Sequence, residues 1–124
     1  MRNKSYLVDT NIISYYFQGK FEVAEYIRKS SLYISFITEI ELKSNPKLSK
    51  QERATIDSFL KTCIILDINA EIKQTAVSII KNHKLKLPDA IIAATASYLK
   101  LELVTADEQF DVLGIPVIIP IIGK

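Results

Sequence analysis

The chain contains few of the residues on which many common sites depend. Its 124 residues include one cysteine, Cys63, and one histidine, His83. A single cysteine cannot form an intramolecular disulfide, and no cysteine or histidine spacing typical of a zinc site is present. His83 lies in a basic segment that we expect to be an exposed turn, so we do not expect it to act as a catalytic base. These absences favour a reducing, cytoplasmic setting.

Long apolar runs and glycine-rich linkers are also missing. No apolar stretch approaches the length of a membrane-spanning helix, and the N-terminus has no signal-peptide core, so we expect a soluble protein that is neither secreted nor anchored. The three glycines leave little room for a hinge, and no repeat is visible. With 48% hydrophobic residues, the length suits one buried core, and we predict a single domain over residues 1–124.

The charge is close to balanced. A formal net charge of +2 results from 16 Lys and Arg against 14 Asp and Glu. This is far below the basic surplus of a protein that binds duplex nucleic acid chiefly through electrostatics. An RNA substrate stays open, because acidic residues gathered in one pocket would leave basic residues to dominate the remaining surface.

Five short segments rich in Leu, Ile and Val are typical of buried parallel strands. We predict strands at residues 5–9, 32–35, 63–66, 101–105 and 116–119. Between these segments the hydrophobic period becomes helical. The alternation implies right-handed βαβ units, and therefore an α/β fold in which a parallel sheet of about five strands is covered on both faces. Pro116 and Pro120 bracket the last strand and indicate that it lies at an edge.

Three helices are indicated by their start signals and apolar stripes. Ser49 and Glu52 form a capping-box pattern ahead of one apolar face. A second stripe begins at Ile72 and repeats at helical spacing. The third helix covers residues 90–99, is apolar almost all round, and has Pro88 where its first turn should lie. We expect this third helix to pack closely against the sheet.

Four acidic residues lie where a strand or an apolar segment meets a turn or a helix start. They are Asp9, Glu41, Asp89 and Asp107. Asp9 and Asp107 follow predicted strands, and the carboxyl ends of parallel strands share one edge of a sheet, where ligands bind. Carboxylates gathered there repel one another and raise each other's pKa unless a cation neutralises them. Mg²⁺ or Mn²⁺ suits such an all-oxygen set, so we predict one or two divalent ions at this edge.

Each acid also has a purely structural interpretation. Asp9 could cap the helix after the first strand, Asp89 would stabilise any helix that it begins, and Asp107 could cap the following turn. Glu39 and Glu41 are two positions apart, so in a helix they point about 200° away from each other and only one can face the pocket. The pattern alone leaves both glutamates open.

Four segments carry a resemblance to a known family. They are Leu7–Ile13, Ile34–Leu42, Leu87–Ala96 and Leu103–Phe110. In this order and spacing they resemble the PIN domain, and within that family the small ribonuclease toxins of bacterial VapBC-type toxin–antitoxin pairs. The resemblance covers the chain nearly end to end. It implies a three-layer α/β/α sandwich.

The resemblance also implies a function. It implies a Mg²⁺- or Mn²⁺-dependent endoribonuclease in which the four acids are both metal ligands and catalytic residues, and it favours Glu41 over Glu39. It further implies a homodimer and a cognate antitoxin whose C-terminal segment covers the acidic pocket. Gln109 departs from the pattern, because family members often carry a further acid just before the phenylalanine. This departure leaves the number of bound ions open.

Other polar and aromatic residues near these segments are candidates for supporting roles. We expect Asn11 and Thr105 to hold the acids or a bound water. Lys43, Lys84 and Lys86 flank the acids and are candidate contacts to an RNA backbone, although charge runs are usually solvated faces. An aromatic run at positions 15–17 favours core and dimer packing, with stacking on RNA bases as the alternative.

Other functions are less well supported by the residues. The main alternative is a PIN-like module that binds RNA or a protein without cutting, which the missing acid before Phe110 would suit. A phosphatase of the haloacid dehalogenase type needs a second Asp two residues after the first, where this chain has Asn11. A receiver domain needs an acidic pair next to Asp9, and none is present.

Overall fold

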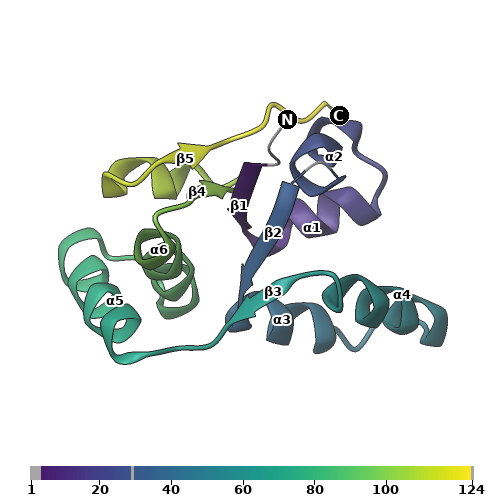
Figure 1. The fold of residues 1–124 in the computed structure, drawn as a ribbon, viewed down its shortest axis with the longest axis horizontal. Coiled ribbons are helices and arrows are strands. Elements are labelled where there is room, and N and C mark those ends of the chain that lie inside the picture. The colour runs from purple at the N-terminus through teal and green to yellow at the C-terminus, as the bar shows by residue number, and fades with distance from the viewer. Residues whose placement is uncertain (1–3, 29, 124) are drawn as a thin grey trace.

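The strands form a single parallel sheet. The computed structural model describes residues 4–28 and 30–123. Within these residues five parallel strands pair in the order β3-β2-β1-β4-β5 (Figure 1). The strands are β1 (Lys4–Val8), β2 (Ser30–Ser35), β3 (Ile64–Leu66), β4 (Glu102–Val104) and β5 (Val117–Ile118). Each overlaps a segment predicted from the sequence, and β5 lies at an edge as Pro116 and Pro120 indicated.

Helices connect the strands. They are α1 (Thr10–Phe17), α2 (Phe21–Arg28), α3 (Phe36–Lys43), α4 (Lys50–Leu60), α5 (Ala70–His83), α6 (Leu87–Leu99) and the short 3-10 helix η1 (Glu108–Leu113). The predicted capping box opens α4, with reciprocal hydrogen bonds between Ser49 and Glu52. Pro88 lies in the first turn of α6, as expected. Among the described helices, none is long and apolar enough to cross a membrane.

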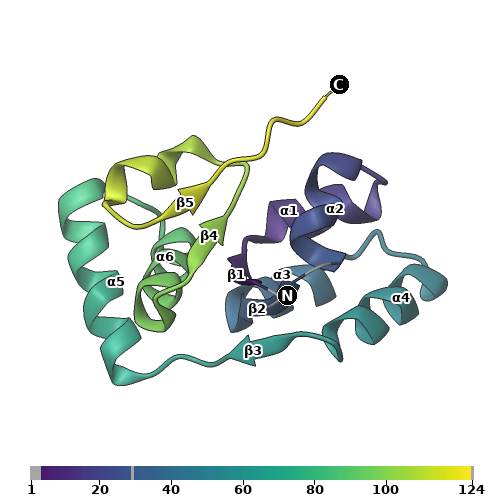
Figure 2. The ribbon, with the colours of Figure 1, turned by 45° about the horizontal axis from the view of Figure 1, so that its top comes forward.

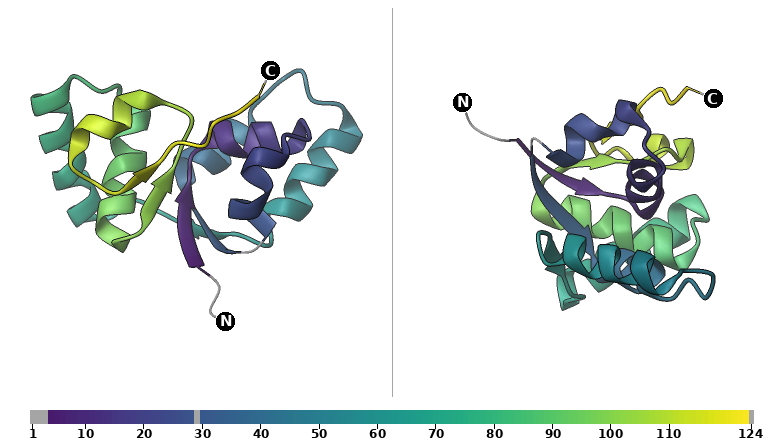
Figure 3. Two further views of the ribbon diagram at one scale, coloured as in Figure 1. Left: turned by 90° about the horizontal axis from the view of Figure 1, so that it is seen from above. Right: turned by 90° about the vertical axis from the view of Figure 1, so that its right-hand side faces the viewer.

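Side chains of β1 alternate between two separate cores, as the period of two in a strand requires. Tyr6 and Val8 pack with apolar residues of α1, α2 and α4, whereas Leu7 packs with α5 and α6. The helices α1, α2 and α4 and the pair α5 and α6 therefore cover opposite faces of the sheet (Figures 2 and 3). The three-layer α/β/α fold predicted from the sequence is confirmed.

The helix α6 is the most deeply buried helix described. Its residues from Ala90 to Ala96 are no more than 7% exposed. Four of these seven are alanines, whose small side chains let the helix approach the sheet closely. The first turn of α6, which carries Asp89, is thereby fixed in position relative to the strands.

The strand order reverses between β1 and β4. In an open parallel sheet, ligands bind in the crevice beyond the carboxyl ends of the strands at such a point. The two strands end level with each other, because the backbone N–H of Asp9 donates to the carbonyl of Val104 over 2.9 Å. The segments that follow, residues 9–11 and 105–107, consequently lie next to each other. This edge is where the sequence placed the acidic residues.

Candidate active site

Asp9 lies at the end of β1 and caps α1. One carboxylate oxygen accepts a hydrogen bond from the backbone N–H of Thr10 at 2.8 Å, and the other accepts one from the hydroxyl of Thr105 at 2.7 Å. The side chain is only 6% exposed. The structural interpretation of Asp9 as a helix cap therefore holds, and it leaves the carboxylate at the crevice as well.

Burial raises the pKa of Asp9 to about 6. The negative charges of Asp89 and Glu41 add to this increase, while the hydrogen bonds from Thr105 and Thr10 act in the opposite direction. The ionised form of Asp9 is thus disfavoured chiefly by burial and to a smaller extent by the neighbouring acids. A group of this kind in a cleft is a candidate for binding a cation or for chemistry.

The helix α3 contributes Glu41 and not Glu39 to this region. The carboxylate of Glu41 accepts a hydrogen bond of 2.6 Å from the hydroxyl of Thr10, directly after Asp9. Glu39 instead forms an ion pair with Lys43 at 3.4 Å. The geometry therefore favours Glu41, the choice that the family resemblance suggested.

Two threonines near Glu41 were not identified from the sequence. The hydroxyls of Thr10 and Thr38 lie 3.0 Å apart, and Thr38 is fully buried. Since the single proton of Thr10 is directed to Glu41, the hydroxyl of Thr38 supplies the hydrogen bond between the two threonines. A signal was available, because Thr38 precedes Glu41 by three residues and so shares its face of a helix.

Asp89 lies in the first turn of α6 and links the other acids. Its side chain is partly buried, and its pKa is raised by burial and then by the charges of Asp107 and Glu41. The charge of Lys86 opposes this increase. No side chain caps the start of α6, and because Pro88 has no N–H, only the first-turn N–H groups of Leu87 and Asp89 are left for an anion.

Asp107 follows β4 and caps the 3-10 helix η1. One carboxylate oxygen accepts from the backbone N–H of Gln109 at 2.9 Å, and the other accepts from the Gln109 side-chain amide at 3.3 Å. The residue that replaces the expected further acid thus holds Asp107 in its capping position. The sequence shows that Gln109 stands where a further acid is expected, but no local pattern indicates its hydrogen bonds to Asp107.

Asn11 and Thr105 tie the two segments of the crevice together. The side-chain oxygen of Asn11 accepts from the backbone N–H of Ala106 at 3.2 Å. The hydroxyl oxygen of Thr105 accepts from the backbone N–H of Asp107 at 3.0 Å while it donates to Asp9. Thr105 therefore contacts Asp9 directly, whereas Asn11 contacts the backbone of the segment that carries Asp107 and none of the four acids.

The donor set suits a hard cation, although its side chains are not arranged as a complete metal site. Electrostatic coupling joins Asp9 to Asp89 and Glu41, and Asp89 to Asp107. Among the described residues, no three acidic, histidine or cysteine side chains lie together as ligands of one ion. Glu41 is exposed and accepts one hydrogen bond, from Thr10, and Asp89 is partly buried, whereas Asp9 is buried and accepts two hydrogen bonds.

The candidate basic residues have different surroundings. Lys86 is close enough to Asp89 to lower its pKa. Lys84 ends α5 in the left-handed conformation with φ of 56° and is exposed. Lys43 is engaged by Glu39. His83 is exposed, as expected, but it is the last residue of the helix α5 and not part of a turn.

The fold and these residues define an α/β protein with carboxylates near one another at the switch point of a parallel sheet. The chain belongs to the PIN domain family, which it matches over residues 6–116. All four acids fall within this match. The family resemblance read from the sequence is confirmed.

Solved structures with the same fold include chains of toxin–antitoxin complexes. A chain of a complex from Klebsiella pneumoniae is 35% identical, with a TM-score of 0.81 and coverage of 94% of this chain and 98% of that chain. A chain of VapBC2 from Rickettsia felis, bound to a promoter DNA fragment, is 21% identical, with a TM-score of 0.81 and coverage of 94% of this chain and 98% of that chain. A chain of VapBC-1 from nontypeable Haemophilus influenzae is 23% identical, with a TM-score of 0.78 and coverage of 93% of this chain and 97% of that chain. The last two show the fold alone. No match was found among curated protein sequences.

Proposed function

We propose that this protein is a Mg²⁺- or Mn²⁺-dependent endoribonuclease and the toxin of a toxin–antitoxin pair. The observation that carries the proposal is the electrostatic coupling of carboxylates from separate elements at one crevice. Burial and the neighbouring acids raise the pKa of Asp9 to about 6, and the pKa of Asp89 is raised by burial and by two other acids. Such mutual repulsion costs stability unless a cation is bound, so it is expected where a cation has a function.

The proposed ligands are Asp9, Glu41, Asp89 and Asp107, and they fit a hard divalent ion because every donor is an oxygen. A bound ion of this kind supplies the Lewis-acid and water-activating chemistry needed for phosphodiester hydrolysis. The buried hydrogen bonds to Asp9 present a carboxylate of fixed orientation. The exposed Glu41 and the partly buried Asp89 supply further oxygens beside it.

The residues around the acids have separate tasks in this proposal. Thr105 and Thr10 donate hydrogen bonds that hold Asp9 and Glu41 in place. The uncapped start of α6 and the charge of Lys86 bind a phosphate group of the RNA strand beside Asp89. No histidine is required to accept a proton in this proposal.

A protein partner is part of the proposal. The 35% identical chain comes from a toxin–antitoxin complex, which supports a cognate antitoxin for this chain. We expect the antitoxin to cover the acidic crevice and so to prevent cleavage. We also expect a homodimer, as the resemblance implied.

The test is to compare the wild type with Asp9→Asn and Asp89→Asn. Calorimetry measures Mn²⁺ binding, and incubation of the same protein samples with a total-RNA pool measures cleavage. We expect both variants to lose Mn²⁺ binding and cleavage together while remaining folded. Asp57→Asn, which removes an exposed carboxylate from α4, is the matched control and should behave as the wild type. Cleavage at the wild-type rate by Asp9→Asn would show that the site lies elsewhere.

One alternative is supported by a specific contact. Gln109 occupies both oxygens of Asp107, and a site with one acid withdrawn in this way suits a PIN module that binds RNA or protein without cutting. The same experiment separates the two functions. A wild type that binds RNA but neither binds Mn²⁺ nor cleaves would favour the non-catalytic module.

A further inference from the structure

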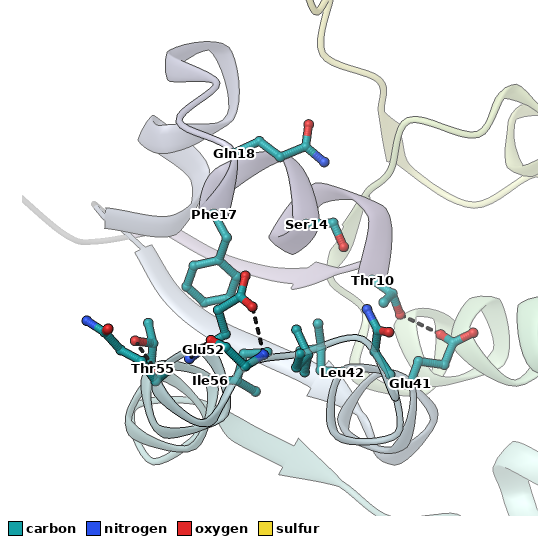
Figure 4. Close-up of a pocket in the computed structure, with 13 residues that line it drawn as sticks. Thr10, Ser14, Phe17, Gln18, Glu41, Leu42, Glu52, Thr55 and Ile56 are labelled. Carbon is teal, nitrogen blue, oxygen red and sulfur yellow. Dashed lines mark hydrogen bonds between the residues drawn. The ribbon is translucent and has the colours of Figure 1, made fainter.

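Glu41 depends on one hydrogen bond for the orientation of its carboxylate. The side chain is exposed, and Thr10 supplies the one hydrogen bond that it accepts from the described residues, over 2.6 Å (Figure 4). The backbone N–H of Thr10 donates at the same time to Asp9. Thr10 therefore connects two of the proposed metal ligands, and the direction of its hydroxyl proton decides how Glu41 is held.

The hydroxyl of Thr38 lies behind this contact. Its oxygen is 3.0 Å from the hydroxyl oxygen of Thr10, and the side chain of Thr38 is fully buried. Thr38 has no other side-chain hydrogen bond among the residues that the structure describes. A buried hydroxyl that does not donate its proton costs stability. Thr10 is the acceptor that is left for the proton of Thr38.

Two other helical threonines use their hydroxyl groups differently. The hydroxyls of Thr55 and Thr95 donate to the carbonyl four residues earlier in their own helices, at 3.1 and 2.7 Å. This is a common arrangement for a threonine inside a helix. Thr38 lies in the first turn of α3, and its hydroxyl instead meets a residue of α1, 28 positions away in the sequence. Its hydroxyl is thus used between helices and not within one.

The two hydrogen bonds form a chain from Thr38 through Thr10 to Glu41. A hydroxyl group has one proton, so the Thr10 oxygen accepts from Thr38 and its own proton goes to the carboxylate. Hydrogen bonds that are linked in this way polarise and strengthen one another. The chain begins at a fully buried residue and ends at an exposed one. It therefore connects an exposed carboxylate to a fixed position in the core.

We propose that Thr38 is a positioning residue for the divalent-ion site, and that it acts on Glu41 through Thr10 without touching the ion. The proposal rests on the proposed metal-dependent function, in which Glu41 is a ligand. A carboxylate whose orientation is already fixed loses less freedom when it binds an ion, so the affinity is higher. The hydroxyl group of Thr38, and not the volume of its side chain, is what the site requires.

The experiment separates the hydroxyl group of Thr38 from its methyl group. Thr38→Val keeps the shape and removes the hydroxyl, whereas Thr38→Ser keeps the hydroxyl and removes a buried methyl group. We expect calorimetry to show a loss of Mn²⁺ affinity of about threefold in Thr38→Val, less than the loss of about tenfold or more for a direct partner of a ligand. Thr38→Ser should retain the wild-type affinity, although its melting temperature in EDTA should fall because the lost methyl group leaves a cavity.

A second set of variants tests whether the effect passes through Thr10. Thr10→Val removes the middle hydroxyl and should lower Mn²⁺ affinity by about tenfold. Adding Thr38→Val to Thr10→Val should cause no further loss, because the hydrogen bond to Glu41 is already absent. A role of Thr38 in packing alone would not depend on Thr10, so the loss would persist in the double variant. Thr95→Val, at a buried threonine that donates within α6, is the control and should retain the wild-type affinity.

Wild-type Mn²⁺ affinity in Thr38→Val, or an equal loss of affinity in Thr38→Ser, would overturn the proposal. A further loss in Thr10→Val/Thr38→Val would also overturn it. None of these results contradicts the proposed function if the wild type binds Mn²⁺ and cleaves RNA. A wild type that binds Mn²⁺ without cleaving RNA would contradict the ribonuclease function alone, and a wild type that does not bind Mn²⁺ would contradict both.

Discussion

Thr105 donates a hydrogen bond of 2.7 Å to Asp9, although the two residues are 96 positions apart in the sequence. Thr105 is fully buried, and its oxygen also accepts from the backbone N–H of Asp107. A single hydroxyl group thus fixes the orientation of one acid and the position of the segment that carries another. This arrangement depends on β1 and β4 being neighbours in the sheet.

Replacing this threonine should weaken metal binding. Thr105→Val keeps the shape but cannot donate to Asp9, so we expect the affinity for Mn²⁺ to fall by about tenfold and the free energy of unfolding to fall by about 1–3 kcal/mol. Calorimetry and urea denaturation measure the two effects. Thr95→Val is the control, because Thr95 is also buried and donates to the carbonyl of Ile91 within α6. An unchanged Mn²⁺ affinity in Thr105→Val would mean that this hydrogen bond does not orient a ligand.

The stability of the metal-free protein should depend on the ionisation of Asp9. Its pKa rises from 3.8 to about 6 on folding, chiefly through burial. Protonation is therefore easier in the folded state. The stabilising contribution of the protonated group is complete below pH 4, is lost as the pH rises through about 6, and is absent above it. A shift of this size corresponds to about 2–3 kcal/mol.

Asp9→Asn removes the charge and should therefore stabilise the protein at high pH only. In EDTA at pH 7.5 we expect a higher melting temperature than that of the wild type, and at pH 4 the difference should vanish. Added Mn²⁺ should raise the melting temperature of the wild type and leave that of the variant unchanged. A variant that is less stable than the wild type at pH 7.5 in EDTA would show that the hydrogen bonds of the carboxylate outweigh its burial.

The sheet could be predicted because its signals are local. The runs of Leu, Ile and Val gave all five strands, and the reciprocal pattern of Ser49 and Glu52 gave the start of α4. From the sequence, Asp9 could be either a helix cap or a metal ligand. In the structure it caps α1, and its carboxylate also lies at the edge of the sheet where ligands bind. The end of a parallel strand makes both possible, since the next helix begins at the edge where ligands bind.

The contacts between distant residues could not be predicted in the same way. No local pattern shows that Thr10 donates to Glu41, because the strand order must be known before α1 and α3 can be placed together. The hydrogen bonds of Gln109 to Asp107 depend on a turn that forms a 3-10 helix. The pocket that Thr10, Phe17 and Glu41 line (Figure 4) depends on how α1 lies relative to α3 and α4, to which no residue pattern corresponds.

The two glutamates of α3 offer a matched pair for locating the ligand. Glu41 accepts from Thr10 beside Asp9, whereas Glu39 pairs with Lys43. We therefore expect Glu41→Gln to reduce Mn²⁺ affinity and RNA cleavage by at least about tenfold, while Glu39→Gln retains both. Both variants replace a carboxylate of α3 with an amide, so a difference in Mn²⁺ affinity between them reflects only the position of the carboxylate. The reverse result would assign the site to Glu39.

The lysines before α6 should contribute to RNA binding through charge. Lys86 is near enough to Asp89 to lower its pKa, and Lys84 is exposed two residues earlier. Each phosphate contact adds about 0.7 to the slope of log affinity against log salt for a single strand. If both lysines make one contact, Lys84→Gln/Lys86→Gln should lower this slope by about 1.4, as measured by anisotropy over a salt series in EDTA. Lys61→Gln/Lys73→Gln removes the same net charge from exposed lysines that shift no acid of the site. It should leave the slope unchanged, and equal slopes for the two double variants would place the phosphate contacts elsewhere.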